Sequence, residues 1–298
     1  MEIFKSENFL EFSEQFSSDE KCKQYLADIK WVDGFVCKKC GNKKYSERKN
    51  LIRTCTLCKT DESPTAHTAF HKVKFGLRKA FHITFEVVNS TKSLSAKQVA
   101  VRYGITRKSA WLFIHKIRKV MKSSEQDPMD GDVHVDEFTI GGREEGKQGR
   151  SYDTRKKKVV AAVELTEDGG VKRVYAQKIQ DYSSKSLREI FTRHISAEAH
   201  ITTDKWKGYR PLMKDYNITQ IDSDKGSSMP QMHFIIHQIK SWLRTIHSWV
   251  HPEHVQSYLD EFCFRINRSI YKKTIFHKTI ERVVLSRNLT YKEIIVPK

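Results

Sequence analysis

Four cysteines in two short pairs constrain the fold of this chain more than any other feature. The pairs are Cys37-x2-Cys40 and Cys55-x2-Cys58, with residues 41–54 between them. This spacing is typical of two loops that present four thiolates to one tetrahedral zinc ion. The alternatives are a pair of disulfides, which need an oxidising compartment, or four unrelated buried thiols. We therefore expect a structural Zn²⁺ site at these cysteines.

The sequence contains no signal for export or membrane insertion. It opens Met1-Glu2-Ile3-Phe4-Lys5, with an early acidic residue and no continuous apolar segment, so no signal peptide is expected. No run approaches the ~20 apolar residues that span a bilayer, which excludes a membrane-spanning class. The remaining cysteines, Cys22 and Cys263, are expected to be reduced and partly buried in helices.

The charge balance points to a polyanionic partner. Lys and Arg number 54 against 36 Asp and Glu, which gives a formal charge of +18. A chain this basic is expected to bind nucleic acid through the release of counterions. The alternative is that the cations are spread over solvated faces, because charge alone does not identify a partner. With 298 residues, of which 38% are hydrophobic, the chain can form about two domains with real cores.

Residues 94–111 predict two helices joined by a glycine turn. Ser95 and Gln98 form a capping-box start, Gly104 suits the turn, and Thr106 caps the second helix. The second helix is predicted to bury Trp111, Ile114 and Ile117 and to expose Arg107, Lys108, Lys116 and Arg118. A helix, a turn and a basic helix form a helix-turn-helix pattern, whose second helix can enter a major groove. An ordinary αα-hairpin is the alternative; beside a zinc module we favour DNA binding.

The predicted secondary structure changes from helices to mainly strands beyond a polar linker at residues 123–132. The expected elements are a helical stretch over residues 1–30, the cysteine module over 31–62, helices over 76–89 and 274–285, strands over 133–140, 158–165, 171–179 and 199–203, and a helix after Ser183–Ser184. Three hairpin-linked strands, a helix and a strand resemble the first half of a ribonuclease-H-like fold. The predicted fold class is therefore a multidomain α+β or α/β chain, with a zinc ribbon, a helix-turn-helix and a mixed sheet flanked by helices.

Two aspartates occupy the positions where such a fold places catalytic carboxylates. Asp136 lies on the first predicted strand, and Asp204 follows the fourth. Cleavage of a phosphodiester by two metal ions needs hard oxygen ligands that hold the ions about 4 Å apart. Taken singly, each aspartate is most often a turn residue or a helix cap. Their joint placement at predicted strand ends favours catalysis.

The chain resembles the zinc-ribbon insertion-sequence transposases of bacteria, which carry a DDE-type ribonuclease-H-like domain. The matching pieces in chain order are Cys22, the zinc ribbon, Ser63–Phe70, the helix-turn-helix with Ala110-Trp111, Val135-Asp136-Glu137 with Gly141-Gly142, residues 146–150, Thr203-Asp204 with Gly208-Tyr209, Lys240–Arg244, and Tyr258–Phe262 with Phe264-Arg265 and Asn267-Arg268. The expected domains are an N-terminal helix and zinc ribbon over 1–70, a helix-turn-helix region over 71–125, and a catalytic domain with C-terminal helices over 126–298.

The resemblance implies a function and its cofactors. Such an enzyme recognises the terminal inverted repeats of its own element, cuts strands by hydrolysis and joins 3′ ends to target DNA. It uses Mg²⁺ or Mn²⁺, as two catalytic ions, besides the structural zinc. Its partners are double-stranded DNA and other copies of itself, since transposases generally act as homo-oligomers that pair two DNA ends. In a bacterial source the location would be the cytoplasm, in association with the nucleoid.

The resemblance also assigns catalytic roles. Asp136 and Asp204 match the first two catalytic positions. Relatives carry Asn or Glu at a third, helical position, with Lys two residues after the Asn; here these positions are Gln238 and Lys240. An amide lacks the charge of a carboxylate, which removes attraction to a dication of the order of a few kcal/mol. His237 and Glu261 are the substitute ligands we consider, with packing and an ion pair as their alternative roles.

Several cations are expected to contact DNA. In the functional interpretation Lys240 contacts a phosphate beside the scissile bond; in the alternative, it and Arg244 are solvated cations. The DNA-contacting residues that we expect elsewhere are Arg107, Lys108, Lys116, Arg143, Lys147 and Arg150. Contacts of this kind to the DNA backbone give affinity without sequence choice.

Three functions therefore compete. The first is an active DDE-type transposase. The second is a binding module, meaning a decayed transposase relic or a zinc-ribbon and helix-turn-helix DNA-binding regulator. The third is a ribonuclease-H-like nuclease that acts without strand transfer.

Overall fold

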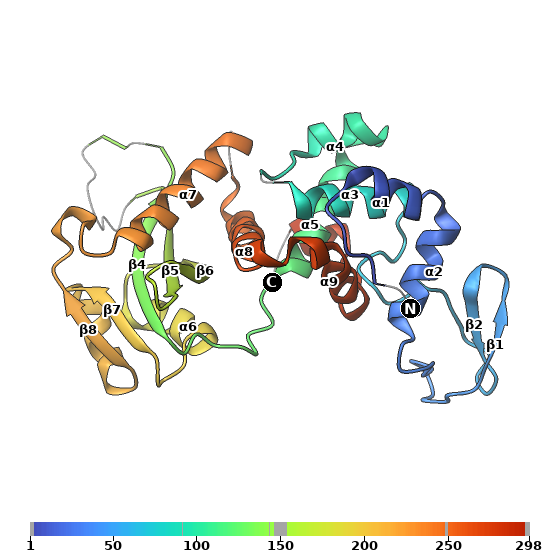
Figure 1. The fold of residues 1–298 in the computed structure, drawn as a ribbon, viewed down its shortest axis with the longest axis horizontal. Helices are drawn as coiled ribbons and strands as arrows, with labels where there is room; N and C mark the ends of the chain where they lie inside the picture. Colours follow the sequence, from blue (N-terminus) through green and yellow to red (C-terminus); the bar gives the residue numbers. More distant parts are fainter. Residues whose placement is uncertain (1–2, 91, 143, 146–153, 248–249, 296–298) are drawn as a thin grey trace. The chain divides into compact units, whose positions relative to one another are not determined.

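The computed structural model describes residues 3–90, 92–142, 144–145, 154–247 and 250–295. The chain divides into two compact units (Figure 1). Unit 1 comprises Met1–Met121 and Arg268–Lys298, and unit 2 comprises Lys122–Asn267. Residues 268–298, which we expected beside the catalytic sheet, are thus part of the unit that holds the zinc ribbon.

Unit 1 is helical apart from a small sheet of three strands in the order β1-β2-β3. Its elements are α1 (Phe9–Gln15), α2 (Asp19–Lys30), β1 (Tyr45–Arg48), the 3₁₀ turn η1 (Lys49–Leu51), β2 (Ile52–Cys55), β3 (Asp61–Glu62), α3 (Leu77–Asn89), α4 (Ala96–Tyr103), α5 (Arg107–Met121), η5 (Ser269–Tyr271), α9 (Lys272–Leu285) and α10 (Tyr291–Ile295). The stretch expected to be helical over residues 1–30 forms two helices. The first ends at Gln15 with Phe16 as its C-cap, and Ser18 caps the start of α2 by accepting a hydrogen bond from the Lys21 N–H.

Aromatic rings from distant parts of the sequence form the core of unit 1. Phe12 of α1 stacks on Phe85 of α3, with ring centroids 4.1 Å apart. Phe276 of α9 meets the Phe12 ring edge-on, with the centroids 4.8 Å apart. Helix α9 also packs against α2, α3 and α5. This burial explains why the C-terminal segment belongs to unit 1, since its apolar face is covered there.

The helix-turn-helix is present with the predicted caps. Ser95 and Gln98 form the capping box, and Gly104 ends α4 in the left-handed conformation with φ 58°. The expectation that Lys116 and Arg118 lie on the outer face of α5 is wrong, because these side chains are only 6% and 2% exposed. The Lys116 ammonium donates a hydrogen bond to Asn288 at 2.7 Å, so it packs within unit 1 and is not available to DNA.

Unit 2 is a mixed sheet flanked by helices. Its elements are β4 (Asp132–Ile140), β5 (Lys157–Leu165), β6 (Val171–Ile179), α6 (Ser184–His194), β7 (His200–Asp204), η2 (Lys207–Lys214), β8 (Asn217–Ile221), η3 (Asp224–Gly226), α7 (Pro230–Ile246), η4 (Pro252–His254) and α8 (Val255–Ile266). The strand order is β6-β5-β4-β7-β8, with β4 at the centre. The first three strands run antiparallel, whereas β7 and β8 run parallel to β4. The predicted mixed sheet and fold class are confirmed.

Apolar side chains fill both faces of the sheet of unit 2. One core holds Val133 and Val135 of β4 with Leu187 and Phe191 of α6. The other holds Phe138 of β4 with residues of α7 and α8. The alternation along β4 therefore sends odd-numbered residues up to 135 to one face and even-numbered ones to the other. Because helices cover both faces, the central strand is held rigidly where the site residues begin.

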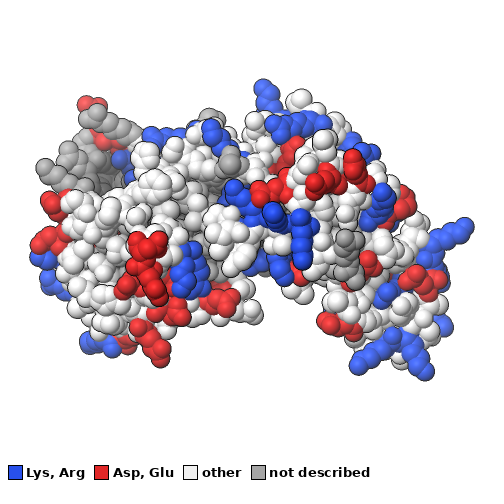
Figure 2. All heavy atoms as spheres, viewed as in Figure 1, with Lys and Arg blue, Asp and Glu red and all other residues white. Residues whose placement is uncertain are grey.

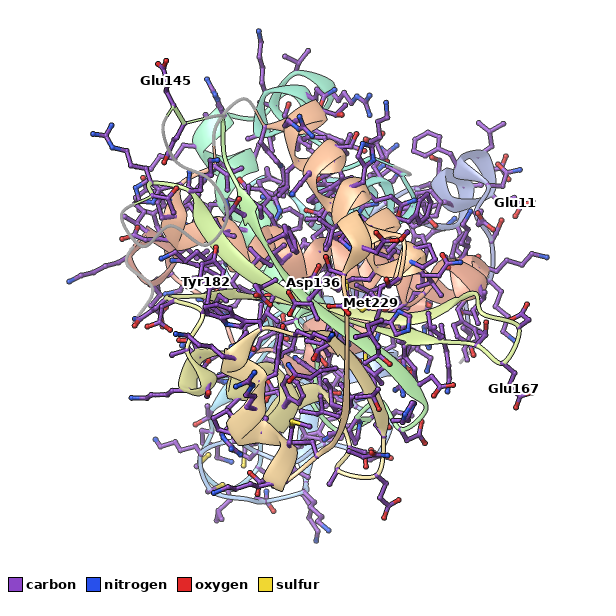
Figure 3. All side chains as sticks on the ribbon, turned by 90° about the vertical axis from the view of Figure 1, so that its left-hand side faces the viewer. Glu11, Asp136, Glu145, Glu167, Tyr182 and Met229 are labelled. Atoms are coloured by element: carbon purple, nitrogen blue, oxygen red, sulfur yellow. The ribbon has the colours of Figure 1, made fainter. Side chains whose placement is uncertain are left out.

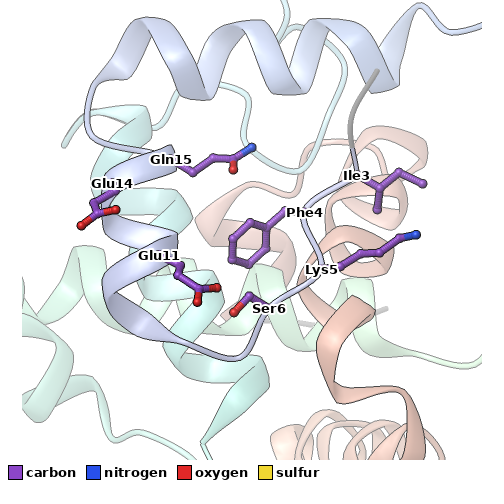
Figure 4. A pocket seen from close by; sticks show the side chains of 7 residues that line it. All are labelled: Ile3, Phe4, Lys5, Ser6, Glu11, Glu14 and Gln15. Carbon is purple, nitrogen blue, oxygen red and sulfur yellow. The ribbon is translucent and has the colours of Figure 1, made fainter.

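Surface features alone do not locate a functional site. On the face drawn in Figure 2, basic side chains are interspersed with acidic and neutral ones within each unit. A hollow in unit 1 is lined by Ile3–Ser6 and by Glu11, Glu14 and Gln15 of α1 (Figure 4). It contains none of the aspartates singled out above. Among the described residues, helices with the length and apolar character needed to cross a bilayer are absent.

A buried ion pair ties the start of β4 to the β5–β6 hairpin, and it predicts a pH dependence of stability. Glu164 is fully buried and accepts hydrogen bonds from Arg173 and Lys172. Burial by itself would raise the pKa of Glu164, but these two cations more than offset it and lower the pKa to about 2, from an ordinary 4.5. The stabilisation is therefore present above pH 4.5 and is lost as the pH falls towards 2.

We expect Glu164→Gln to lower the free energy of unfolding at neutral pH, because it removes one partner of this ion pair. The loss should be larger at pH 6 than at pH 2.5 by about 2 kcal/mol, measured by urea denaturation of both proteins. A loss that is the same at both pH values would contradict the assignment.

Candidate active site

Two aspartates from different strands come together at the centre of the sheet in unit 2. The parallel pairing of β4 with β7 ends with Val135 opposite Thr203. The next residue of each strand is therefore an aspartate, and Asp136 and Asp204 lie close together at the carboxyl end of the pairing. Figure 3 labels Asp136 among the strands of this sheet. Backbone N–H groups orient both carboxylates, from Glu137 to Asp136 at 2.8 Å and from Trp206 to Asp204 at 3.0 Å.

Glu137 adds a third carboxylate that the sequence argument did not assign. Ligand oxygens of Asp136, Glu137 and Asp204 all lie within 4.8 Å of one another. Neighbouring residues on a strand usually point to opposite faces, so the sequence alone did not group Glu137 with Asp136. In the structure the Tyr209 hydroxyl donates a hydrogen bond to Glu137, and the tyrosine shortly after Asp204 is the sequence signal that could have indicated this contact.

The Tyr209 hydroxyl orients this third carboxylate by donating a hydrogen bond to Glu137. Tyr209 is fully buried. Burial raises its pKa well above the ordinary value, and the charges of Glu137 and Asp136 raise it further. The phenol therefore stays protonated and acts as a hydrogen-bond donor at neutral pH. The neighbouring Gly208 admits no side chain, because a Cβ there would lie 2.7 Å from the carbonyl oxygen of Tyr182.

The three carboxylates fit divalent cations that prefer oxygen ligands. Two oxygens on one ion, each about 2.1 Å from it, lie at most about 4.2 Å apart. The oxygens of the observed cluster lie within 4.8 Å of one another, which is close to this limit and suits two ions about 4 Å apart. Bringing three acidic side chains this close is costly unless cations offset their repulsion. Asp136, Glu137 and Asp204 could therefore hold Mg²⁺ or Mn²⁺.

His233 of α7 lies beside the carboxylates. Its Nε2 is 3.8 Å from Oδ2 of Asp136. A helix turns by about 100° per residue, so Gln238 lies about 140° around the axis from His233, whereas Lys240 follows two turns later on the same face. The catalytic role of Gln238 therefore stays a prediction, whereas the side chain of α7 whose distance to Asp136 is established is that of His233, seven positions before Lys240.

Lys240 lies over the same strand as Asp136. Its ammonium is 5.3 Å from the ring centroid of Phe138, which shares a face of β4 with Asp136. Burial lowers the pKa of Lys240, and the charge of Arg244 lowers it further, whereas Asp136 raises it. The Lys240 ammonium of α7 thus lies near the carboxylates, on the face of the sheet that α7 covers.

The other substitute ligands lie outside this cluster. Glu261 is fully buried, and its Oε1 is 2.7 Å from Nη2 of Arg265 on the same helix, so it forms a structural ion pair. His237 is exposed. Three residues expected to contact DNA, Arg143, Lys147 and Arg150, fall outside the described residues.

The four cysteines of the two CxxC pairs in unit 1 form the predicted cluster. Their sulfur atoms lie within 4.8 Å of one another, with Sγ–Sγ distances of 3.5 Å for Cys37–Cys58 and 3.6 Å for Cys40–Cys55. A tetrahedral zinc ion with bonds of 2.3 Å sets its sulfur ligands about 3.8 Å apart, so the donor set fits. The Asn42 amide donates a hydrogen bond to Sγ of Cys55 at 3.4 Å and orients this ligand.

Two basic residues begin the second helix of the helix-turn-helix. Arg107 and Lys108 are exposed at the N-terminal end of α5. The Lys108 ammonium lies 4.5 Å from the ring centroid of Tyr291. Unlike Lys116, both residues are placed where a ligand in solution can meet them.

Comparisons with known proteins find two family models, one that matches residues of unit 1 and one that matches residues of unit 2. The family model described as an ISXO2-like transposase domain matches residues 128–267, which include Asp136, Asp204 and His233. The family model described as a transposase zinc-ribbon domain matches residues 17–61, which include all four clustered cysteines. A search of the curated proteins finds no match to the chain. The first match ends at Asn267, where unit 2 also ends.

We expect Cys55→Ser to lose the zinc ion and to destabilise unit 1, because metal binding and folding of such a module are coupled. Elemental analysis should find one zinc per wild-type chain and less than about a tenth of that in the variant. Cys22→Ala is the matched control, since Cys22 is buried in α2 and lies outside the cluster. Equal zinc content in wild type and Cys55→Ser would contradict the site.

Proposed function

We propose that this chain, which belongs to the zinc-ribbon insertion-sequence transposases with an ISXO2-like transposase domain, recognises the terminal inverted repeats of its element and catalyses metal-dependent strand cleavage and strand transfer. The observation that carries the proposal is the convergence of three carboxylates at the centre of the sheet, within the residues that the transposase-domain family matches. A purely DNA-binding sheet would have no need for this concentration of negative charge.

The carboxylates would hold the catalytic cations in fixed positions. When bound, two divalent cations supply activation of the attacking oxygen and stabilisation of the leaving oxygen. Asp136 and Asp204 contribute oxygens that backbone N–H groups already orient. Tyr209 fixes Glu137 in the same way. Little reorganisation is then needed when DNA arrives, which is the condition under which electrostatic catalysis is most effective.

Basic residues on α7 would position the DNA phosphates. Lys240 lies beside the carboxylate cluster, where its ammonium can act as a point charge on a phosphate next to the scissile bond. Arg244 follows one turn later on the same face of the helix and is exposed. When a strand of DNA lies against the carboxylates, the negative charges of its phosphates can thus be neutralised by cations of the neighbouring helix α7.

Recognition of the element's ends would fall to unit 1. Its helix-turn-helix exposes Arg107 and Lys108 at the start of the second helix, the part of a recognition helix that commonly reaches base edges. The two ends of an element are paired during transposition, so we propose a homo-oligomer on double-stranded DNA. The salt dependence expected of these basic contacts follows from counterion release.

The proposal predicts that Asp136→Ala binds labelled inverted-repeat duplex as tightly as wild type but joins no strands. With Mg²⁺ or Mn²⁺ present, strand transfer should fall by at least about 10³-fold, because the carboxylate that aligns the cations is removed. Asp132→Ala is the matched control: Asp132 lies four residues earlier on β4, is exposed and pairs with His200. This control should retain activity.

Other outcomes of the same assay identify the competing functions. If wild type and Asp136→Ala are equally inert, the chain is a decayed relic or a DNA-binding regulator. If wild type nicks DNA with metal but never joins ends, it is a nuclease without strand transfer.

A further inference from the structure

We propose that His233 is a nitrogen ligand of the catalytic cation and that it gives this site a preference for Mn²⁺ over Mg²⁺. The inference rests on the proposed function, because it concerns the same carboxylate site. It goes further in assigning a ligand and a metal preference.

The imidazole lies at a distance that two ligands of one ion can have. Nε2 of His233 is 3.8 Å from Oδ2 of Asp136. Ligands with bonds of about 2.1 Å are separated by about 3 Å when adjacent and by about 4.2 Å when opposite. The observed separation falls between these limits and is too long for a hydrogen bond.

The nitrogen that faces Asp136 lacks a hydrogen bond among the described residues. Nε2 of His233 is buried and has no hydrogen-bond partner there. A buried polar atom without a partner is costly, and a metal bond is one explanation for its presence. Within the part of the chain that the structure describes, this nitrogen faces the Asp136 carboxylate, which is itself part of the carboxylate cluster.

The fold holds the imidazole ring in this place. Gly226, in η3, has φ +99°, and a Cβ added to it would lie 2.9–3.0 Å from three ring atoms of His233, including Nε2. The backbone therefore approaches the ring so closely that any side chain at position 226 would have to displace it, and the positive φ favours glycine there as well. On the other side, α7 fixes His233 two turns before Lys240. A ring confined in this way is pre-organised to bind an ion.

The donor set then determines which ion is preferred. Mg²⁺ strongly favours oxygen ligands, whereas imidazole suits transition ions. Asp136, Glu137 and Asp204 supply oxygens, and His233 would add one nitrogen. Mn²⁺ accepts carboxylates as readily as Mg²⁺ does and also binds imidazole. The position where relatives carry Asn or Glu is Gln238 here, which keeps an oxygen donor, and the nitrogen of His233 would act as a ligand from a different position of the same helix.

The alternative is that a protonated His233 forms an ion pair with Asp136. In that case the imidazole would compete with the metal for the carboxylate, and removing it would strengthen metal binding. The two roles thus make opposite predictions for one substitution.

The test uses the zinc-loaded chain of 298 residues, titrated with Mn²⁺ or Mg²⁺ in the absence of DNA. Electron spin echo envelope modulation of bound Mn²⁺ should show coupling to a ¹⁴N nucleus in wild type and none in His233→Asn. Isothermal titration should show about a tenfold loss of Mn²⁺ affinity in His233→Asn and less than about a twofold change for Mg²⁺. His237→Gln, one turn later on α7 and exposed, is the matched control and should keep the nitrogen coupling.

Each other result has a definite meaning. Mn²⁺ that binds wild type without nitrogen coupling, or binds His233→Asn more tightly, overturns the role of His233 but leaves the proposed function intact if Asp136→Asn abolishes the binding. Nitrogen coupling that persists in Asp136→Asn also overturns the inference, because the ion then lies elsewhere. A wild type that binds neither ion would remove both the inference and the proposed function. Circular dichroism of each variant confirms that it is folded.

Discussion

The parallel pairing of β4 with β7 is the constraint on which the rest of the site depends. Because it ends with Val135 opposite Thr203, the next residue of each strand enters the same space, and both are aspartates. A shift of one residue in this register would turn one carboxylate into the opposite core. The apolar packing on both faces of the sheet fixes the register, so the stability of unit 2 and the geometry of its site have the same origin.

The groups around this strand pairing stabilise three negatively charged side chains that lie close together. Each carboxylate accepts a hydrogen bond from a group that cannot lose its proton at neutral pH, namely a backbone N–H for Asp136 and Asp204 and the buried Tyr209 phenol for Glu137. The Lys240 ammonium of α7 lies over Phe138, on the same face of β4 as Asp136. The arrangement suits dications and the phosphates that they would bind, which is the chemistry that we propose for this site.

The sequence was sufficient to predict the sheet and the convergence of Asp136 and Asp204, but not which side chain of α7 lies beside them. Strands such as β6 could be predicted because alternation and turn residues are local signals, and the order of elements then placed Asp136 and Asp204. Choosing between Gln238 and His233 requires the rotation of α7 against the sheet, which depends on contacts distant in sequence. Lys116 was misplaced for the same reason, since the segment that buries it, with Asn288, lies far along the chain. The residue pattern of one helix does not reveal which other segments of the chain pack against it.

The most direct test of the account is a crystal structure of the chain with Mn²⁺, with the ion located by its anomalous scattering. The account predicts an anomalous peak between Asp136 and Asp204, about 2.2 Å from an oxygen of each and from Nε2 of His233. Carboxylates that point away from each other, or Mn²⁺ found only at other places, would contradict it.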